Sequence, residues 1–187
     1  MNVVIFGPPG AGKGTQAQNI VKKFNLHQVS TGDLLRTEIK NKSEIGKEIE
    51  EIISKGDFAT DDVVNKLIKN IVFDPQKKDK LIFDGYPRSL SQAKNLDLLL
   101  DSSNQKIDFI FFLNVNKDTI IKRIERRKTL EKRSDDDSST ILKRYDAYME
   151  TTRPVLDFYS SRSYFYEIDG SEKIEVISSK IEQIIAV

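Results

Sequence analysis

The sequence predicts an α/β fold in which a doubly wound parallel sheet is covered by helices on both faces. Short apolar runs rich in β-branched and aromatic residues alternate along the chain with helical patterns, as in successive βαβ units. Within these runs the apolar residues are consecutive, which is typical of strands buried on both sides. The chain has 187 residues, a length that suits a single domain, so we expect residues 1–187 to form one.

The predicted strands are bounded by Gly, Pro, Asn or Asp, which interrupt regular structure. They are Asn2–Phe6, Lys80–Phe83, Phe109–Leu113 and Tyr164–Ile168. A weaker strand is expected at residues 27–29.

The helical patterns between these strands fall into ordinary connections and two exceptions. The first connection has apolar residues from Ala17 to Phe24 at the spacing of one helix face. Residues 30–59 hold two helical patterns with no strand between them, which predicts a small helical insert. Residues 128–137 are polar and without periodicity, which predicts a loop, and its acidic end at 135–137 favours the start of the next helix.

Composition excludes several classes of function. Thirty Lys and Arg residues oppose 29 Asp and Glu, so the net charge of +1 gives no general attraction to nucleic acid or to an anionic membrane. The absence of cysteine excludes disulfide scaffolds, thiolate zinc sites and cysteine nucleophiles, and a single histidine argues against a histidine metal site. The longest apolar run, residues 109–113, is far shorter than the roughly 20 residues of a membrane span. With no signal-peptide pattern at residues 1–7, we expect a cytoplasmic protein without membrane or nucleic-acid partners.

A phosphate-binding loop is predicted directly after the first strand. Residues 7–13 read Gly-Pro-Pro-Gly-Ala-Gly-Lys and lead into a helix, so backbone N–H groups, the helix N-terminus and Lys13 can all face phosphate oxygens. The alternative is a Gly- and Pro-rich turn with an incidental lysine, which the strand–loop–helix context disfavours. Gly14 follows the lysine where a hydroxyl is usual, and the hydroxyl comes at Thr15. We therefore expect Mg²⁺ to be held mainly by phosphates and water, with Asp84 acting through water and no direct protein ligand.

A second anion site is predicted from arginines near the ends of other strands. Arg88 comes shortly after the strand at 80–83, at the sheet edge where open α/β sheets bind ligands. Gln92 lies four residues further on and shares its face if a helix starts at Ser89. Residues 30–33 fit a helix-capping box, which leaves Arg36 unexplained.

Further arginines follow on the next predicted helices. Arg123 and Arg127 flank a buried isoleucine stripe, Arg144 borders the next stripe, and Lys143 is expected to point to solvent. Arg133 lies in the predicted loop between these helices. Any one of these arginines is most simply a solvated surface charge, but together with a phosphate loop they favour a second phosphate site. The arginines concerned are Arg36, Arg88, Arg123, Arg127, Arg133 and Arg144.

These motifs, in this order and over essentially the whole chain, resemble those of adenylate kinases. The motifs that carry the resemblance are residues 7–16, residues 30–36, residues 84–88 with Gln92, Arg123 with Arg127, and Arg133 with Arg144. The resemblance implies a five-stranded parallel core, an AMP-binding helical insert at 30–59 and a lid at 126–136 that closes over ATP.

The resemblance also implies roles for individual residues. For ATP they are Gly10, Ala11, Gly12, Lys13, Gly14, Thr15, Arg123, Arg127 and, through the backbone of residues 169–172, Glu172. For AMP they are Thr31, Arg36, Asp57, Phe58, Ala59, Gly85, Tyr86, Pro87, Arg88, Gln92, Arg133 and Arg144. The residues expected to act on the transferring phosphoryl group are Lys13, Arg88, Arg133 and Arg144.

The chain departs from the family pattern in its lid. Only Lys-Thr-Leu-Glu-Lys separates Arg127 from Arg133, with no cysteine or histidine, so the chain is similar to short-lid members and no zinc is expected. Tyr86 stands where phenylalanine is commoner.

The expected reaction is transfer of the γ-phosphoryl group of MgATP to AMP, giving two ADP, by a monomeric enzyme. The acceptor is already an anion, so no general base is required, and catalysis rests on positioning and cationic side chains. One alternative is a UMP/CMP kinase of the same architecture, against which Thr31 and Gln92 match the adenylate pattern. The other is a binding module that hydrolyses ATP slowly, against which stands the set of second-site arginines.

Overall fold

A parallel sheet forms the centre of the molecule. The computed structural model describes residues 1–55, 57, 59–131 and 138–186, with the side chains of 126–131 and 138–141 left aside. Within this part of the chain the sheet has five strands in the order β2-β3-β1-β4-β5, all parallel. They are β1 (Val3–Phe6), β2 (His27–Ser30), β3 (Leu81–Asp84), β4 (Phe109–Asn114) and β5 (Phe165–Asp169). Every predicted strand is confirmed, and the weak one at 27–29 pairs with β3 along its whole length.

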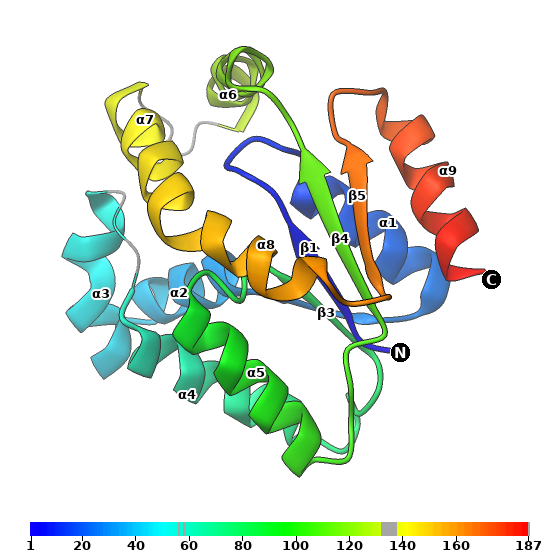
Figure 1. Ribbon diagram of the computed structural model, residues 1–187. Coiled ribbons are helices and arrows are strands. Elements are labelled where there is room, and N and C mark those ends of the chain that lie inside the picture. The colour runs from blue at the N-terminus through cyan, green and yellow to red at the C-terminus, as the bar shows by residue number, and fades with distance from the viewer. Residues whose placement is uncertain (56, 58, 132–137, 187) are drawn as a thin grey trace.

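Helices connect successive strands, as predicted for a doubly wound fold (Figure 1). They are α1 (Lys13–Phe24), α2 (Thr31–Lys40), α3 (Glu44–Ser54), α4 (Asp61–Val72), α5 (Leu90–Ser102), α6 (Lys117–Glu131), α7 (Ser138–Ala147), the π-helix η1 (Tyr148–Thr152), α8 (Arg153–Ser160) and α9 (Ile174–Ile185).

The sheet has a separate apolar core on each face, because successive strand residues point to opposite sides. Val4 and Phe6 of β1 pack into a cluster with residues of α4, α5 and α8. Val3 and Ile5 belong to a second cluster, which includes residues of α1, α6 and α9. Consecutive apolar residues in β1 are therefore all buried, as the sequence pattern requires.

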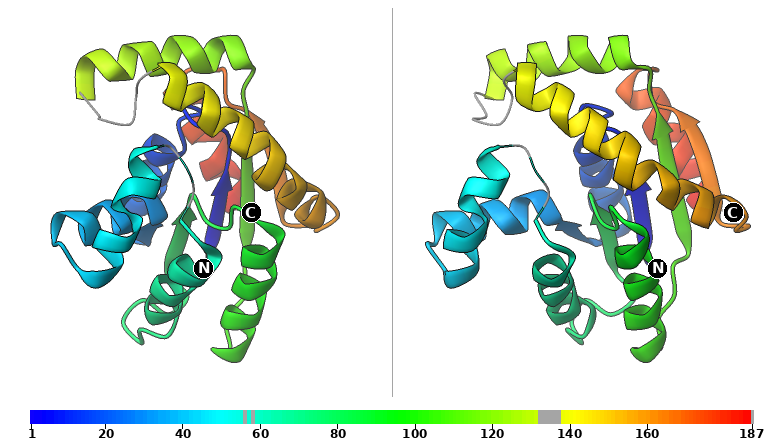
Figure 2. Two further views of the ribbon diagram at one scale, coloured as in Figure 1. Left: turned by 90° about the vertical axis from the view of Figure 1, so that its left-hand side faces the viewer. Right: turned by 60° about the vertical axis from the view of Figure 1, so that its left-hand side comes forward.

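The helical insert predicted between residues 30 and 59 consists of α2 and α3, with no strand between them (Figure 2). The two helices pack so closely that a Cβ atom on Gly46 would lie 2.1 Å from the carbonyl oxygen of Glu38. Ser43 caps α3, since its Oγ accepts a hydrogen bond from the backbone N–H of Gly46 at 2.9 Å.

The loop predicted at 128–137, and the lid loop predicted at 126–136, are wrong in their first part. Helix α6 continues through Glu131. Residues 126–131 contain no glycine or proline and are mostly good helix formers, so propensity extends the helix beyond its buried stripe. Residues 132–137, with the acidic run, lie outside the described residues, and α7 begins at Ser138.

Helix α7 passes through a π-helical turn into α8. Pro154 lies in the first turn of α8 and has no backbone N–H to donate to the preceding turn. Thr151 adds a side-chain hydrogen bond from Oγ1 to the carbonyl of Ala147, 2.6 Å away. The chain therefore widens into η1 at this point instead of continuing as a regular α-helix.

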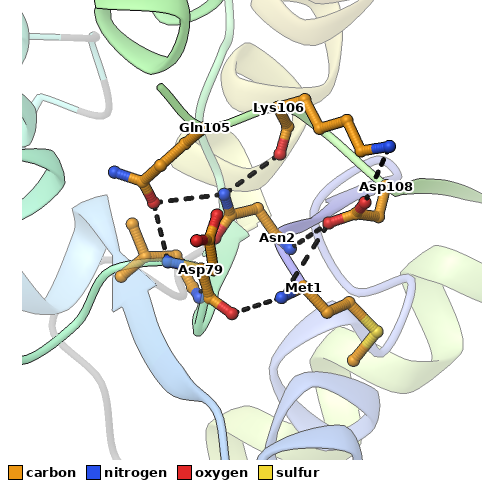
Figure 3. Close-up of polar contacts among 7 residues, drawn as sticks. Met1, Asn2, Asp79, Gln105, Lys106 and Asp108 are labelled. Atoms are coloured by element: carbon orange, nitrogen blue, oxygen red, sulfur yellow. Dashed lines mark hydrogen bonds and ion pairs between the residues drawn. The ribbon is translucent and has the colours of Figure 1, made fainter. Parts of the chain in front are cut away.

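A buried polar network joins the strands at the amino edge of the sheet (Figure 3). The Asn2 side chain is 0% exposed; its Nδ2 donates to Lys106 O at 3.0 Å and to Gln105 Oε1 at 3.3 Å, and its Oδ1 accepts from Leu81 N at 3.1 Å. Gln105 Oε1 also accepts from the backbone N–H of Asp79 at 2.8 Å. Asn2 thus ties the beginnings of β1 and β3 to the segment before β4.

No helix in the described part of the chain is long and apolar enough to cross a membrane.

Candidate active site

The predicted site segments meet at the carboxyl edge of the sheet. Gly7 follows β1, Thr31 follows β2 and Gly85 follows β3, and because the strands are parallel these three turns lie at one edge. This is the edge at which open α/β sheets bind ligands.

The loop after β1 has the backbone of a phosphate cradle. Gly10 and Gly12 have φ of +80° and +94°, in the region that favours glycine, and Gly12 caps the start of α1. A Cβ atom on Gly10 would lie 2.8 Å from Cγ1 of Ile124, so the loop also packs tightly against α6. Lys13 donates from Nζ to the carbonyl of Gly7 at 2.8 Å and to that of Pro8 at 3.0 Å. Its ammonium group therefore lies over the loop, where a phosphate would bind.

Arg123 joins the phosphate loop to the loop after β5. Its Nη1 donates to the carbonyl oxygen of Ala11 at 3.3 Å and its Nη2 to that of Ser171 at 3.4 Å. The structure therefore brings together three segments that the sequence singled out separately.

Glu172 directs its side chain away from this junction. Its Oε2 accepts from Nζ of Lys180 at 2.7 Å, on the same C-terminal segment. The loop is shaped by Asp169, whose Oδ1 accepts from Ser171 Oγ at 2.5 Å and from the backbone N–H of Ser171 at 2.9 Å. The side-chain hydrogen bond, helped by the backbone one, holds the pKa of Asp169 below its usual value. Any contribution of Glu172 to a ligand at Arg123 would come from its backbone.

A pocket of about 540 Å³, measured with the open space at its mouth, lies between the helical insert and the β3–α5 turn. Its size suits a nucleotide. Its lining residues come from α2, α3, α4, α5, α7 and the turns between them: Thr31, Gly32, Leu35, Arg36, Ile53, Asp57, Ala59, Val64, Gly85, Arg88, Gln92 and Arg144.

Gly85 organises the floor of this pocket. Its carbonyl oxygen accepts from Thr31 Oγ1 at 2.8 Å and from Arg88 Nε at 2.7 Å. A Cβ atom on Gly85 would lie 2.9 Å from Arg88 Nη2 and 3.0 Å from Thr31 Oγ1, and its φ is +77°. Only glycine at this position allows both side chains to approach the turn.

Gln92 is held in place by Asp61, a residue that the sequence analysis missed. Gln92 is 4% exposed; its Oε1 accepts from the backbone N–H of Arg88 at 2.7 Å, and its Nε2 donates to Asp61 Oδ1 at 2.7 Å. Asp61 Oδ2 accepts from Ser89 Oγ at 2.8 Å. An acidic residue in the first turn of a helix is explained by the helix dipole alone, so the sequence contained no separate signal for this contact.

Tyr86 lies buried beneath the same turn and does not line the pocket. Its hydroxyl donates to Asn65 Oδ1 at 2.8 Å and accepts from Asn95 Nδ2 at 3.1 Å, and burial raises its pKa to about 12. The hydrogen bonds to these two amides explain how a tyrosine hydroxyl is accommodated here, at a position where phenylalanine is commoner in the family that the chain resembles.

A second pocket, of about 440 Å³ with its open mouth, adjoins the first and extends to the phosphate loop. The two share Gly85, Arg88 and Arg144 in their linings, and the second also includes Lys13. Arg88 and Arg144 therefore stand between the pocket under the insert and the phosphate loop. Desolvation and, to a smaller extent, the nearby cation of Arg144 together lower the pKa of Arg88 to about 10, so an anion bound here would relieve both effects.

The remaining predicted residues divide into those placed near the pocket and those outside the described part. Arg36 lines it while forming an ion pair with Asp33 at 2.5 Å, and Asp57 and Ala59 line it too. Thr15 is exposed in the first turn of α1, and Pro87 lines the second pocket. Arg127 lies on α6 with its side chain undescribed; Phe58 and Arg133 lie outside the described residues.

The helix pattern predicted that Lys143 points to solvent, but its half-exposed side chain contacts another segment. Its Nζ lies 2.8 Å from Asp57 Oδ1 across the gap between α7 and the insert. A single-helix projection could not anticipate this, because the partner belongs to a distant segment.

The donors near the first turn of α1 fit a magnesium–nucleotide complex. Asp84 Oδ2 lies 3.6 Å from the position of a Cβ atom on Gly14, and it accepts from Gln28 Nε2 at 3.1 Å. One carboxylate beside a phosphate loop is what Mg²⁺ on a nucleotide usually requires, since phosphates and water supply its other ligands. In the parts of the chain that are described, no group of three or more His, Cys, Asp and Glu side chains could hold a metal ion by itself.

Comparison with known proteins identifies the family. The family model for adenylate kinase matches residues 5–164. An adenylate kinase of Pelagibacter ubique (strain HTCC1062) is 46% identical over 213 aligned positions that cover all of both chains. Adenylate kinases of Caulobacter sp. (strain K31) and Thermosipho africanus (strain TCF52B) are 36% and 32% identical, each covering at least 99% of both chains.

The chain belongs to the adenylate kinase family. It is accordingly a phosphotransferase that binds nucleotides, and its five-stranded α/β architecture is consistent with this family. Neither the UMP/CMP kinase nor the non-catalytic binding module is favoured by the comparisons.

Proposed function

We propose that the two adjoining pockets hold the two substrates of one reaction, in which the γ-phosphoryl group of MgATP passes to AMP and gives two ADP. The observation that carries this proposal is the shared wall of Gly85, Arg88 and Arg144 between a pocket of nucleotide size and the phosphate loop. A phosphate in each pocket would face the other across these two cations.

ATP would bind along the phosphate loop. Backbone N–H groups of residues 10–15 and the N-terminus of α1 would hold its phosphates, with Lys13 at the outer ones. Arg123 contacts both the phosphate loop and Ser171, so ATP would extend past its side chain from the phosphate loop to the loop at 169–172. Arg127 would add a second cation from the next turn of α6.

AMP would bind beneath the insert. Thr31, Gly85 and Arg88 form one hydrogen-bonded unit, and Gln92 is fixed beside it by Asp61. Arg36 is 40% exposed, and a phosphate can compete with Asp33 for its guanidinium group. Asp57 and Ala59, which line the same pocket, would complete its nucleoside side, while buried Tyr86 would support the turn without touching the nucleotide.

The chemistry would rest on positioning and on positive charge. The acceptor phosphate is already nucleophilic, so the chain needs only to align it with the γ-phosphoryl group and to stabilise the charge on the transferring oxygens. Lys13, Arg88 and Arg144 surround the second pocket. Arg133, which follows α6 in the sequence, would join them from a short lid as water is excluded from the site.

Mg²⁺ would be held by the ATP phosphates and water, with Asp84 and Thr15 orienting that water. When bound, the ion neutralises charge on the β- and γ-phosphates. The chain has no cysteine and one histidine, so we propose no role for zinc.

We further propose a cytoplasmic monomer with a short lid. The alignment with the Pelagibacter protein exceeds the length of this chain, so that relative has insertions where this chain has none, whereas the Caulobacter alignment spans 187 positions.

A panel of acceptors tests this assignment. Purified enzyme is given MgATP with AMP, GMP, CMP or UMP, or with no acceptor, and diphosphate formation is followed. We expect AMP to be the preferred acceptor by a large margin and ATP hydrolysis without acceptor to be slow. Preference for UMP or CMP would overturn the AMP assignment, and ATP hydrolysis that no acceptor accelerates would overturn the transfer reaction.

A further inference from the structure

Tyr148 lines the second pocket and has a buried hydroxyl group without a hydrogen-bond partner. Its side chain is 6% exposed, and it lines this pocket together with Lys13, Arg88 and Arg144. Among the described residues, its hydroxyl is the buried side-chain polar atom that has no hydrogen-bond partner.

Tyr148 lies where the regular α-helix is interrupted. Tyr148 opens the π-helix η1, and such turns inside helices are frequent at functional sites. Thr152 at the other end of η1 also lines the pocket, and its Oγ1 donates to the backbone carbonyl of Arg88 at 3.0 Å. The same turn therefore holds the Arg88 segment and presents Tyr148 beside it.

Other buried tyrosines of the chain show what a purely structural hydroxyl looks like. Tyr159 is 0% exposed, and its hydroxyl lies 3.3 Å from both the carbonyl of Ala93 and Oδ1 of Asp97. Tyr86 has two amide partners, as described above. A buried hydroxyl without a partner is destabilising, so phenylalanine would be the better residue at 148 if packing were its only role.

We propose that the Tyr148 hydroxyl is a substrate contact, donating a hydrogen bond to a phosphate oxygen of the nucleotides held between Lys13 and Arg88. This inference rests on the proposed placement of phosphates in the second pocket. Phosphate oxygens are strong acceptors, and three cationic residues line the same space. Burial raises the pKa of Tyr148 above its usual value, so the group remains a protonated donor and does not act as a base.

The substitution Tyr148→Phe removes only the hydroxyl and tests this contact. We expect the melting temperature of the ligand-free protein to stay the same or rise, since no internal hydrogen bond is lost. We expect kcat/KM for ADP formation to fall about ten- to a hundredfold, the effect of one hydrogen bond to a charged group. The rise in melting temperature on adding ADP should shrink in the variant as well.

Tyr159→Phe is the matched control, because it removes a hydroxyl that has internal partners away from both pockets. It should lower the melting temperature and leave kcat/KM unchanged. A Tyr148→Phe enzyme with kcat/KM within twofold of the parent, or with a lowered ligand-free melting temperature and full activity, would overturn the substrate contact.

Arg144→Ala, assayed in parallel, separates this failure from failure of the proposed function. If Arg144→Ala is inactive and Tyr148→Phe is fully active, only the role of Tyr148 is wrong. If both variants are fully active, the second pocket does not hold the transferring phosphate, and the proposed site fails with the inference.

Discussion

Nζ of Lys143 on α7 lies 2.8 Å from Oδ1 of Asp57 in the segment after α3, and this ion pair connects the helix that carries Arg144 to the rim of the pocket under the insert. Both side chains are about half exposed, at 50% and 48%. Such a pair contributes at most about 1 kcal/mol to stability and is weakened by salt. Its position between two parts of the site is therefore more informative than its strength.

Lys143→Ala should raise KM for AMP a few-fold at low ionic strength, because Asp57 loses the contact that holds it at the pocket rim. The effect should disappear in about 1 M salt, where the Debye length is about 3 Å. The double exchange Lys143→Asp with Asp57→Lys should restore the parental KM, and Lys94→Ala on α5 is the exposed-lysine control. A KM for AMP that does not change at low salt would contradict this role.

Lys13→Met should leave the fold intact and remove nearly all phosphoryl transfer. Its hydrogen bonds to the carbonyls of Gly7 and Pro8 lie within its own loop, so their loss should disturb the tertiary structure little. Loss of a preorganised charge at the transferring group costs at least about 10²-fold in turnover. Circular dichroism melting and a coupled assay of ADP formation measure the two effects, and near-normal turnover would disprove the phosphate-loop assignment.

Arg144→Ala and Arg133→Ala should each lower turnover far more than they change the affinity for AMP or ATP. An arginine that stabilises the transition state of phosphoryl transfer is worth roughly 10³–10⁵ in rate. Arg144 lines both pockets. We expect Arg133 to reach the transferring group from a short lid.

Turnover and dissociation constants for both arginine variants decide the matter. Lys94→Ala is the control here as well, because Lys143 contacts Asp57 at the pocket rim and its substitution is itself expected to change KM. Turnover within about fivefold of the parent, roughly 1 kcal/mol, would show that the arginine concerned has no transition-state role.

Binding of AMP should take up protons near pH 10. The pKa of Arg88 is lowered to about 10, so part of the free enzyme loses this charge as the pH rises toward that value. A bound phosphate favours the charged form and raises this pKa again, so protonation accompanies binding and affinity falls as the pH rises through 10. Titration calorimetry in two buffers of different ionisation enthalpy should give a larger proton uptake at pH 10 than at pH 8. Equal uptake at both pH values would refute the assignment to Arg88.

Asn2→Leu should destabilise the protein without changing its chemistry. The substitution leaves the buried backbone N–H of Leu81 and the carbonyl of Lys106 without their partner at the amino edge of the sheet, opposite the site. We expect the free energy of unfolding to fall by about 2–4 kcal/mol, measured by denaturant titration, with kcat unchanged at 25 °C. Lys106→Ala, whose side chain is 84% exposed, should change it by less than about 0.5 kcal/mol. A loss below about 1 kcal/mol for Asn2→Leu would mean that the network is not stabilising.

Features that depend only on neighbouring residues could be predicted from the sequence. Alternation of apolar runs and helical patterns is local, and it predicted all five strands of the sheet and the helical insert. The phosphate loop was equally clear, because the φ values of Gly10 and Gly12 and the start of α1 at Lys13 depend on residue type within a few positions. The loop predicted at 128–137 was wrong in its first part because polarity is a weak signal when helix propensity remains good.

Which of these parts contact one another could be seen only in the folded chain. Asp61 at Gln92, Lys143 at Asp57 and Arg123 between Ala11 and Ser171 are contacts between distant segments, and no periodicity in one helix specifies its partner in another. The unpartnered hydroxyl of Tyr148 likewise depends on tertiary packing, and no motif in the sequence indicates it. Side-chain partners depend on how layers pack around the sheet, which is a property of the whole chain, whereas strands, helices and glycine turns follow from local backbone preferences.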